Sequence, residues 1–189
     1  IVRWPGLNRR GRCEQLIYGM DLAPTLCELL GLPVPARWDG HSFAPALRGE
    51  PFAGWPYLVW EHGIYTFTRA VRTPEWLLIQ VLHPGLYPYD EPLMLHDMRA
   101  DPHQATNLAA ERPAVVAELM ARLGEWRAAQ IEKGGAPDPL EAMVATGPFL
   151  YYTPEQMVER LERTGRSHRV PELKQRLARY GARMSRRET

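Results

Sequence analysis

The sequence predicts an α+β fold in which a small antiparallel sheet of about four strands is covered by one long helix. Four segments between residues 57 and 96 are rich in aromatic and β-branched residues, which favour strands. After Pro113, apolar residues recur three and four positions apart, as they do along one face of a helix. Glycines and prolines separate these segments into elements of ordinary length.

Before the sheet, the sequence predicts one helix and two short strands. The strands are expected at residues 1–4 and 15–18. Residues 20–31 are expected to form the helix, because Asp21 is a favourable N-cap residue and leucines recur along one face. The leucines that share this face are Leu22, Leu26, Leu29 and Leu30.

The four strands of the sheet are expected at residues 57–60, 66–72, 76–82 and 93–96. A Thr-Pro-Glu turn joins the second strand to the third as a hairpin. The long helix is expected to begin near Pro113 and to end at a Gly-Gly pair followed by two prolines, which marks a linker.

The tail is predicted to contain two amphipathic helices after that linker. The sequence Thr153-Pro154-Glu155-Gln156 has the chemistry of a capping box, with the threonine as the cap. A last helix is expected from Pro171. We expect this tail to pack on the main body, and oligomerisation is the alternative.

The composition argues against two classes of partner. Lys and Arg number 23 against 22 Asp and Glu, so a net charge of +1 gives no reason to expect nucleic acid. No apolar run approaches the roughly 20 residues of a membrane span.

Cys13 and Cys27 do not make a disulfide framework. The chain starts without Met or a signal peptide, so we expect a fragment and infer no compartment.

Two segments resemble motifs of the sulfatase family. The end of the predicted sheet resembles the closing pattern Leu-Tyr-Asp-Leu-x-x-Asp-Pro-x-Glu-x-x-Asn-Leu, and the matching residues are Leu95, Asp97, Asp101, Pro102, Asn107 and Leu108. The early helix resembles Asp-Leu-x-Pro-Thr-Leu-x-x-Leu-x-Gly followed by Pro and Asp-Gly-x-Ser, and the matching residues are Asp21, Leu22, Pro24, Thr25, Leu26, Leu29, Gly31, Pro33, Asp39, Gly40 and Ser42. With Trp4-Pro5-Gly6 before them, the motifs occur in the family's order, and the resemblance covers about residues 1–130.

The resemblance implies a division of the chain into three parts. Residues 1–50 would end the large α/β body of an alkaline-phosphatase-like fold. Residues 51–132 would form the small C-terminal sheet-and-helix subdomain beside the active-site mouth, and residues 133–189 the linker and helical tail. If leucines of the early helix face the larger sheet, the isolated chain exposes apolar surface. We therefore expect it to be unstable or to aggregate.

The resemblance also implies hydrolysis of a sulfate ester or sulfamate, on a sulfated small molecule or glycan. Sulfatases use a formylglycine made from Cys or Ser in Cys/Ser-x-Pro-x-Arg, and a divalent metal, usually calcium. Neither cysteine, and no serine, has Pro two residues on and Arg four residues on. We therefore expect the nucleophile and metal site in an upstream part of the same polypeptide, and no turnover by these 189 residues alone.

Three residues are candidates for substrate contact. His62 is expected in a loop between strands, where binding residues are frequent. Arg69 and Arg72 follow on the next strand, and Arg can bind a sulfate or carboxylate through two hydrogen bonds. Because they are three residues apart, they are expected to face opposite sides of the strand, so at most one faces a shared site. The alternative is that these arginines are solvated or ion-paired.

Two other functions remain open at this point. A related phosphonate or phosphate monoester hydrolase would share the α/β body and similar tail patterns. A non-catalytic binding module would instead begin near Ile1 and fold alone, and the predicted start inside a strand argues against it.

Overall fold

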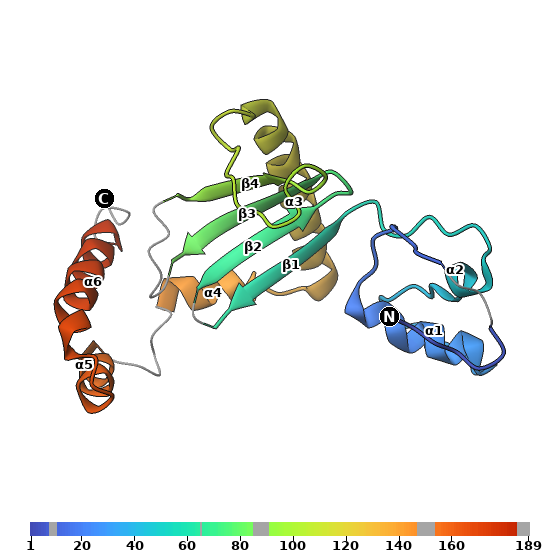
Figure 1. Cartoon of the computed structure of the whole chain (residues 1–189), viewed down its shortest axis with the longest axis horizontal. Coiled ribbons are helices and arrows are strands. Elements are labelled where there is room, and N and C mark those ends of the chain that lie inside the picture. The colour runs from blue at the N-terminus through green and yellow to red at the C-terminus, as the bar shows by residue number, and fades with distance from the viewer. Residues whose placement is uncertain (8–10, 65, 85–90, 147–153, 185–189) are drawn as a thin grey trace.

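The computed structural model describes residues 1–7, 11–64, 66–84, 91–146 and 154–184. The described chain has an N-terminal segment of short helices, a central sheet backed by helices, and a pair of tail helices (Figure 1). Within these residues, no helix combines the length and the apolar content needed to cross a bilayer.

The central sheet has the four antiparallel strands that the sequence predicts. They are β1 (Leu58–Gly63), β2 (Phe67–Arg72), β3 (Trp76–His83) and β4 (Leu93–Asp97). Their order across the sheet is β1-β2-β3-β4, so each strand pairs with its neighbour in sequence. The first strand continues to Gly63, three residues beyond its expected end.

One face of the sheet packs on the long helix α3 (Pro113–Gly134), which lies behind the strands in Figure 1. The strand register aligns one buried residue from each strand in a row across this face: Val59, Val71, Leu78 and Leu95. Leu119 and Leu123 of α3 pack on that row. Burying each such side chain stabilises the fold by about 1.5–3 kcal/mol. The expected cover of the sheet by one long helix is therefore confirmed.

A shorter helix, α4 (Pro139–Thr146), packs against β1 and β3. The sequence predicted a linker here, because two glycines and two prolines follow α3. Gly135 does end α3, in the left-handed conformation that favours glycine. Pro139 instead occupies the first turn of α4, where its missing N–H costs nothing. The prediction of a linker is therefore wrong for residues 139–146.

The N-terminal segment contains η1 (Gly19–Asp21), α1 (Leu22–Leu29) and α2 (Ala44–Arg48). The expected helix forms, but the expected strands at residues 1–4 and 15–18 do not. Among the described residues, this segment has only an isolated antiparallel bridge between Leu16 and Trp55. A strand needs a partner for its N–H and C=O groups, and the described chain offers none for residues 1–4.

Asp21 holds together the part of the chain that precedes the sheet. Its carboxylate, 1% exposed, accepts the backbone N–H of Tyr18 and of His41, each at 2.7 Å, and the indole N–H of Trp55 at 2.8 Å. It stands at the N-cap position of α1, as predicted, but its side chain does not cap that helix. The Tyr18 hydroxyl accepts the backbone N–H of Val59, which links the segment to β1.

The leucine face of α1 is open to solvent in this chain. Leu22, Leu26 and Leu30 are 48%, 39% and 60% exposed. Pro24 and Thr25 are the buried residues of α1. Other large apolar residues of the segment are also exposed: Val2, Ile17, Met20, Leu32 and Val34. The described chain therefore leaves apolar side chains of this segment uncovered, as the resemblance implied.

The tail contains α5 (Pro154–Arg163), η2 (Ser167–Arg169) and α6 (Val170–Met184), so both predicted tail helices are present. The two helices contact each other, and Met157 of α5 is buried.

Candidate functional site

Three candidate residues lie on the β1–β2 hairpin, and the strand alternation divides them between its two faces. Arg69 shares the face that is covered by α3 and α4, where it is ion-paired with Asp138. His62 and Arg72 lie on the opposite, outer face. The predicted separation of Arg69 from Arg72 is therefore confirmed.

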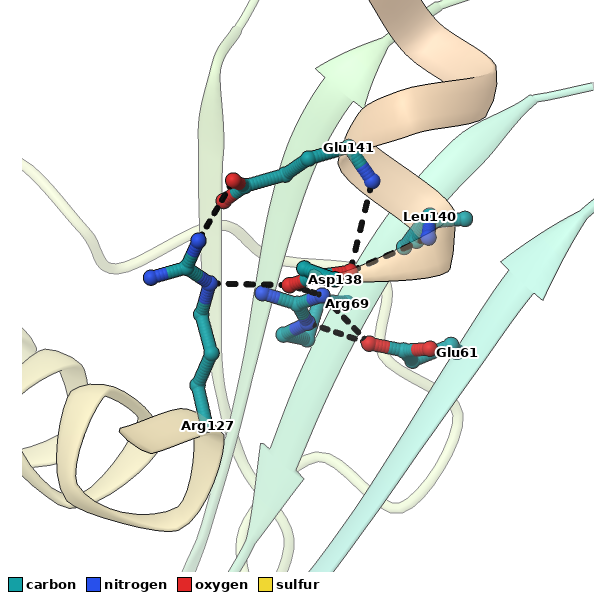
Figure 2. A network of polar contacts seen from close by, with 6 residues as sticks. All are labelled: Glu61, Arg69, Arg127, Asp138, Leu140 and Glu141. Carbon is teal, nitrogen blue, oxygen red and sulfur yellow. Dashed lines mark hydrogen bonds and ion pairs between the residues drawn. The ribbon is translucent and has the colours of Figure 1, made fainter. Parts of the chain in front are cut away.

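The covered face holds a cluster of charged side chains around Arg69 (Figure 2). The Arg69 side chain is 3% exposed. Its Nη2 lies 2.5 Å from Oε1 of Glu61 and 2.6 Å from Oδ2 of Asp138, and its Nε donates to the same Glu61 oxygen at 2.5 Å. Glu61 is also its cross-strand partner. Two carboxylates therefore hold the guanidinium, and this arrangement is the ion-paired alternative that the sequence left open.

Asp138 joins three elements through one buried carboxylate. Its Oδ2 accepts from Arg69 on β2 and, at 2.8 Å, from Nε of Arg127 on α3. Its Oδ1 accepts the backbone N–H groups of Leu140 and Glu141 at 3.0 and 3.3 Å, which makes it the N-cap residue of α4. Burial would raise the pKa of Asp138, but the hydrogen bonds from both arginines and from the Glu141 N–H, together with the charge of Arg69, lower that pKa.

The outer edge of the cluster reaches solvent at Arg127 and Glu141. Nη2 of Arg127 lies 2.5 Å from Oε2 of Glu141, and the two side chains are 36% and 49% exposed. The hydrogen bond to Asp138 is the main reason that the pKa of Arg127 is raised. The exposed pair contributes little to stability, whereas the buried carboxylate of Asp138 is strongly coupled to its partners.

His62 lies within β1 and not in a loop, so that prediction of its location is wrong. The antiparallel register pairs it with Thr68, because β1 continues through the Glu-His-Gly sequence to the end of the hairpin. The imidazole is exposed, and its Nδ1 lies 3.1 Å from the carbonyl oxygen of Thr66 and 3.2 Å from the Thr66 hydroxyl. A carbonyl only accepts, so this contact places the proton of a neutral ring on Nδ1. Nε2 then carries the free lone pair.

Arg72 lies at the other end of the outer face, paired with Leu58 and Leu77. Its side chain is half-buried, and its Nε is buried without a hydrogen-bond acceptor among the described residues. Trp60 lies between the His62 and Arg72 rows on the same face and is 42% exposed. The outer face therefore presents an aromatic ring, an imidazole and a guanidinium.

The other histidines have places in the fold. His83 is buried on β3, and burial lowers its pKa. His96 is buried on β4, with Nδ1 2.8 Å from the carbonyl oxygen of Thr106. Within the part of the chain that the structure describes, no group of three or more His, Cys, Asp or Glu side chains could hold a metal ion.

The polar residues of the closing motif bind backbone groups. Asn107 accepts the N–H of Leu95 at 2.9 Å and of Ala109 at 3.0 Å, and its amide donates to the carbonyl of Leu93 at 3.0 Å. Backbone hydrogen bonds from the turn lower the pKa values of Asp97 and Asp101. The motif therefore fixes the turn between β4 and α3.

Sequence reasoning missed Asp138, the centre of the charged cluster. The Asp-Pro pair at 138–139 is a typical helix start, with an N-cap residue followed by Pro at the first helical position. That pattern could have revealed α4, but not the partner of Asp138 on β2, which lies 69 residues away in sequence.

A family model and several curated relatives match this chain. A model described as N-sulphoglucosamine sulphohydrolase, C-terminal, matches residues 1–129. Delta 4,5-hexuronate-2-O-sulfatase of Bacteroides thetaiotaomicron is 37% identical over 115 residues, which cover 57% of this chain and 23% of that protein. N-acetylglucosamine-6-O-sulfatase of the same organism is 28% identical over 160 residues, which cover 78% of this chain and 27% of that protein.

A solved structure of a 2-O GAG sulfatase is 35% identical, covers 57% of this chain and 24% of that chain, and has a TM-score of 0.48. The chain spans about a quarter of the length of these relatives. The family model covers more than half of the chain. The chain therefore belongs to the family of C-terminal domains of N-sulphoglucosamine sulphohydrolase, within the sulfatases.

Proposed function

We propose that this chain is the C-terminal part of a sulfatase that hydrolyses a sulfate ester or a sulfamate. The observation that carries the proposal is the family match over residues 1–129, together with relatives that are named as sulfatases. The relatives' names include sulfatases of hexuronate and of N-acetylglucosamine. A sulfated glycan or a smaller sulfated sugar is therefore the substrate class that we propose.

The catalytic centre belongs, in this proposal, to an upstream part of the same polypeptide. Among the described residues, no group of three or more His, Cys, Asp or Glu side chains could hold a metal ion, and no cysteine or serine of the sequence stands in a Cys/Ser-x-Pro-x-Arg motif. The residues present therefore do not fit a formylglycine or a calcium site. In the intact enzyme, these groups would supply the nucleophile and offset the charge of the sulfate.

The contribution of this chain to catalysis, in the proposal, is substrate contact at the outer face of the hairpin. His62 offers the lone pair of Nε2, because its Nδ1–H is engaged by the Thr66 carbonyl. A neutral ring in this tautomer can accept a hydrogen bond from a sugar hydroxyl. Arg72, on the same face, can donate to a sulfate or carboxylate oxygen. Arg69 is the weaker candidate, because two carboxylates already hold its guanidinium.

The test uses the full-length protein, encoded by the natural gene with its upstream reading frame. Sulfate release is measured from an aryl sulfate and from 2-O-, 6-O- and N-sulfated sugars, beside hydrolysis of phosphonate and phosphate monoesters. The proposal expects turnover of at least one sulfated compound in the full-length protein and none by the 189-residue chain. Faster turnover of a phosphonate or phosphate monoester would replace the proposal with that activity. Turnover by the 189-residue chain would place the catalytic centre within it.

His62→Ala in the full-length enzyme tests the role of the hairpin. Loss of one hydrogen bond to substrate should raise KM about tenfold. His103→Ala is the matched control, because that histidine is exposed in the turn after β4. Equal KM values for both variants would remove His62 from the substrate site.

A further inference from the structure

Helix α4 lies outside the stretch that the family model matches, yet it is fastened to the hairpin that carries His62. The family match ends at residue 129, and α4 spans Pro139–Thr146. Figure 2 shows its first turn over β1 and β2, with Leu140 and Asp138 directed toward the strands. Two kinds of contact make this attachment, one apolar and one charged.

The apolar contact is between Leu140 and the end of β1. Leu140 is 4% exposed. A Cβ built on Gly63 would lie 3.1 Å from Cδ1 of Leu140 and 3.7 Å from both Cε of Met143 and Cε1 of Phe67. Side chains of α4 therefore rest on the backbone of β1 at Gly63, and a larger residue there would force them away.

The charged contact holds Glu61, the residue before His62 in β1. Asp138 binds Arg69 at 2.6 Å, and Arg69 binds Glu61 at 2.5 Å, so the start of α4 is linked to β1 through β2. Glu61 and Gly63 are the residues on either side of His62. Both are thus held on the covered face, and the imidazole projects from the outer face between them.

We propose that Asp138 is a positioning residue, which fixes the direction of His62 through Arg69, Glu61 and the packing of α4 on Gly63. The inference rests on the proposed function, in which the substrate contacts the outer face of this hairpin. It assigns to residues 138–146 a part in substrate binding, although none of them touches that face.

The energetics of buried charge support a positioning role. Removing Arg69 and Asp138 from water is costly, and two well-packed apolar residues of similar size are often at least as stable. What the ion pair supplies is a fixed direction, because a guanidinium that bridges two carboxylates is restrained in its plane. The arrangement is therefore suited to fixing the geometry of the hairpin.

The experiment compares Asp138→Asn with Glu141→Gln in the full-length protein. Asp138→Asn keeps the shape of the side chain and removes its charge. Glu141→Gln removes the charge of the exposed partner of Arg127 and leaves Asp138 intact. Amide hydrogen exchange of residues 58–72, without substrate, is the first measurement. We expect about tenfold faster exchange in this hairpin for Asp138→Asn, and no change for Glu141→Gln.

The second measurement is kinetic. Loosening of a substrate contact should raise KM about fivefold in Asp138→Asn and leave kcat within about twofold. If Asp138→Asn does not fold, Leu140→Ala replaces it, because that variant keeps the ion pairs and loses the contact with Gly63. Its expected result is the same increase in exchange within the hairpin.

Two outcomes would overturn the inference. Unchanged amide exchange of residues 58–72 in Asp138→Asn and in Leu140→Ala would show that α4 does not restrain the hairpin. Faster exchange with unchanged KM would show that the restraint has no part in substrate binding. If the protein releases no sulfate from any substrate, the proposed function fails, but the exchange experiment still reports on the hairpin.

Discussion

Replacement of Asp21 by Asn is expected to destabilise the protein, although the two side chains have nearly the same shape. The carboxylate accepts three hydrogen bonds: Oδ2 accepts from the Tyr18 N–H and the Trp55 indole, and Oδ1 accepts from the His41 N–H. An amide has only one accepting oxygen. In either orientation its NH2 group faces at least one N–H donor, which then has no acceptor.

The magnitude follows from these contacts. An unpaired buried donor costs about 1–3 kcal/mol, and each remaining bond loses about 1 kcal/mol when its acceptor becomes neutral. With one donor unpaired and the two remaining bonds weakened, Asp21→Asn should lower the free energy of unfolding by about 3–5 kcal/mol. That is a large share of the 5–15 kcal/mol typical of a folded protein.

Urea unfolding followed by tryptophan fluorescence measures this loss, because Trp55 donates directly to Asp21. At a slope of about 2 kcal/mol per molar urea, the midpoint should fall by about 1.5–2.5 M. Asp39→Asn is the matched control: the Asp39 side chain is 59% exposed and pairs with Lys133 at the surface, where an ion pair contributes about 0–1 kcal/mol. Midpoints for the two variants within about 0.2 M of each other would refute the reasoning.

Two further predictions concern the turn after β4 and the charged cluster. Asn107→Ala removes the acceptor for two backbone N–H groups and should lower the free energy of unfolding by about 2–3 kcal/mol. Gln130→Ala, on the exposed side of α3, is the control and should leave the stability nearly unchanged. Equal melting temperatures for the two variants would contradict this prediction. Folding lowers the pKa of Asp138. The ionised carboxylate therefore stabilises the folded protein above the ordinary carboxyl pKa of about 3.9, and this stabilisation is lost as the pH falls through the pKa of Asp138 in the folded protein. The stability difference between the natural protein and Asp138→Asn should therefore shrink below about pH 4, and a constant difference from pH 7 to about pH 3 would contradict this.

The sheet and α3 were predictable from the sequence because their patterns are local. Aromatic and β-branched residues mark each strand, and the spacing of three and four marks the helix, so neither prediction depended on a distant contact. The expected strands at residues 1–4 and 15–18 failed because a strand also needs a partner, which composition does not reveal.

The candidate site was predictable in part. Strand alternation alone separated Arg69 from Arg72, and the structure agrees. The partner of Arg69 was not predictable, because Asp138 meets it only when α4 folds back over the sheet. The location of His62 was wrong by a few residues, since the end of a strand is less well marked in sequence than its centre.

The residues that carry the family resemblance have roles in the fold, and this limits what the resemblance can reveal about substrate. Asp21 and Asn107 bind backbone N–H groups, as do Asp97 and Asp101 in the turn after β4. Under the proposed function, such residues would be needed whichever sulfated compound is the substrate. The side chains of the outer face do not have that constraint: Trp60 and His62 are exposed, and Nε of Arg72 has no acceptor among the described residues. If this face contacts the substrate, as we propose, substitutions that change substrate preference without loss of stability should concentrate on this face and spare the motifs.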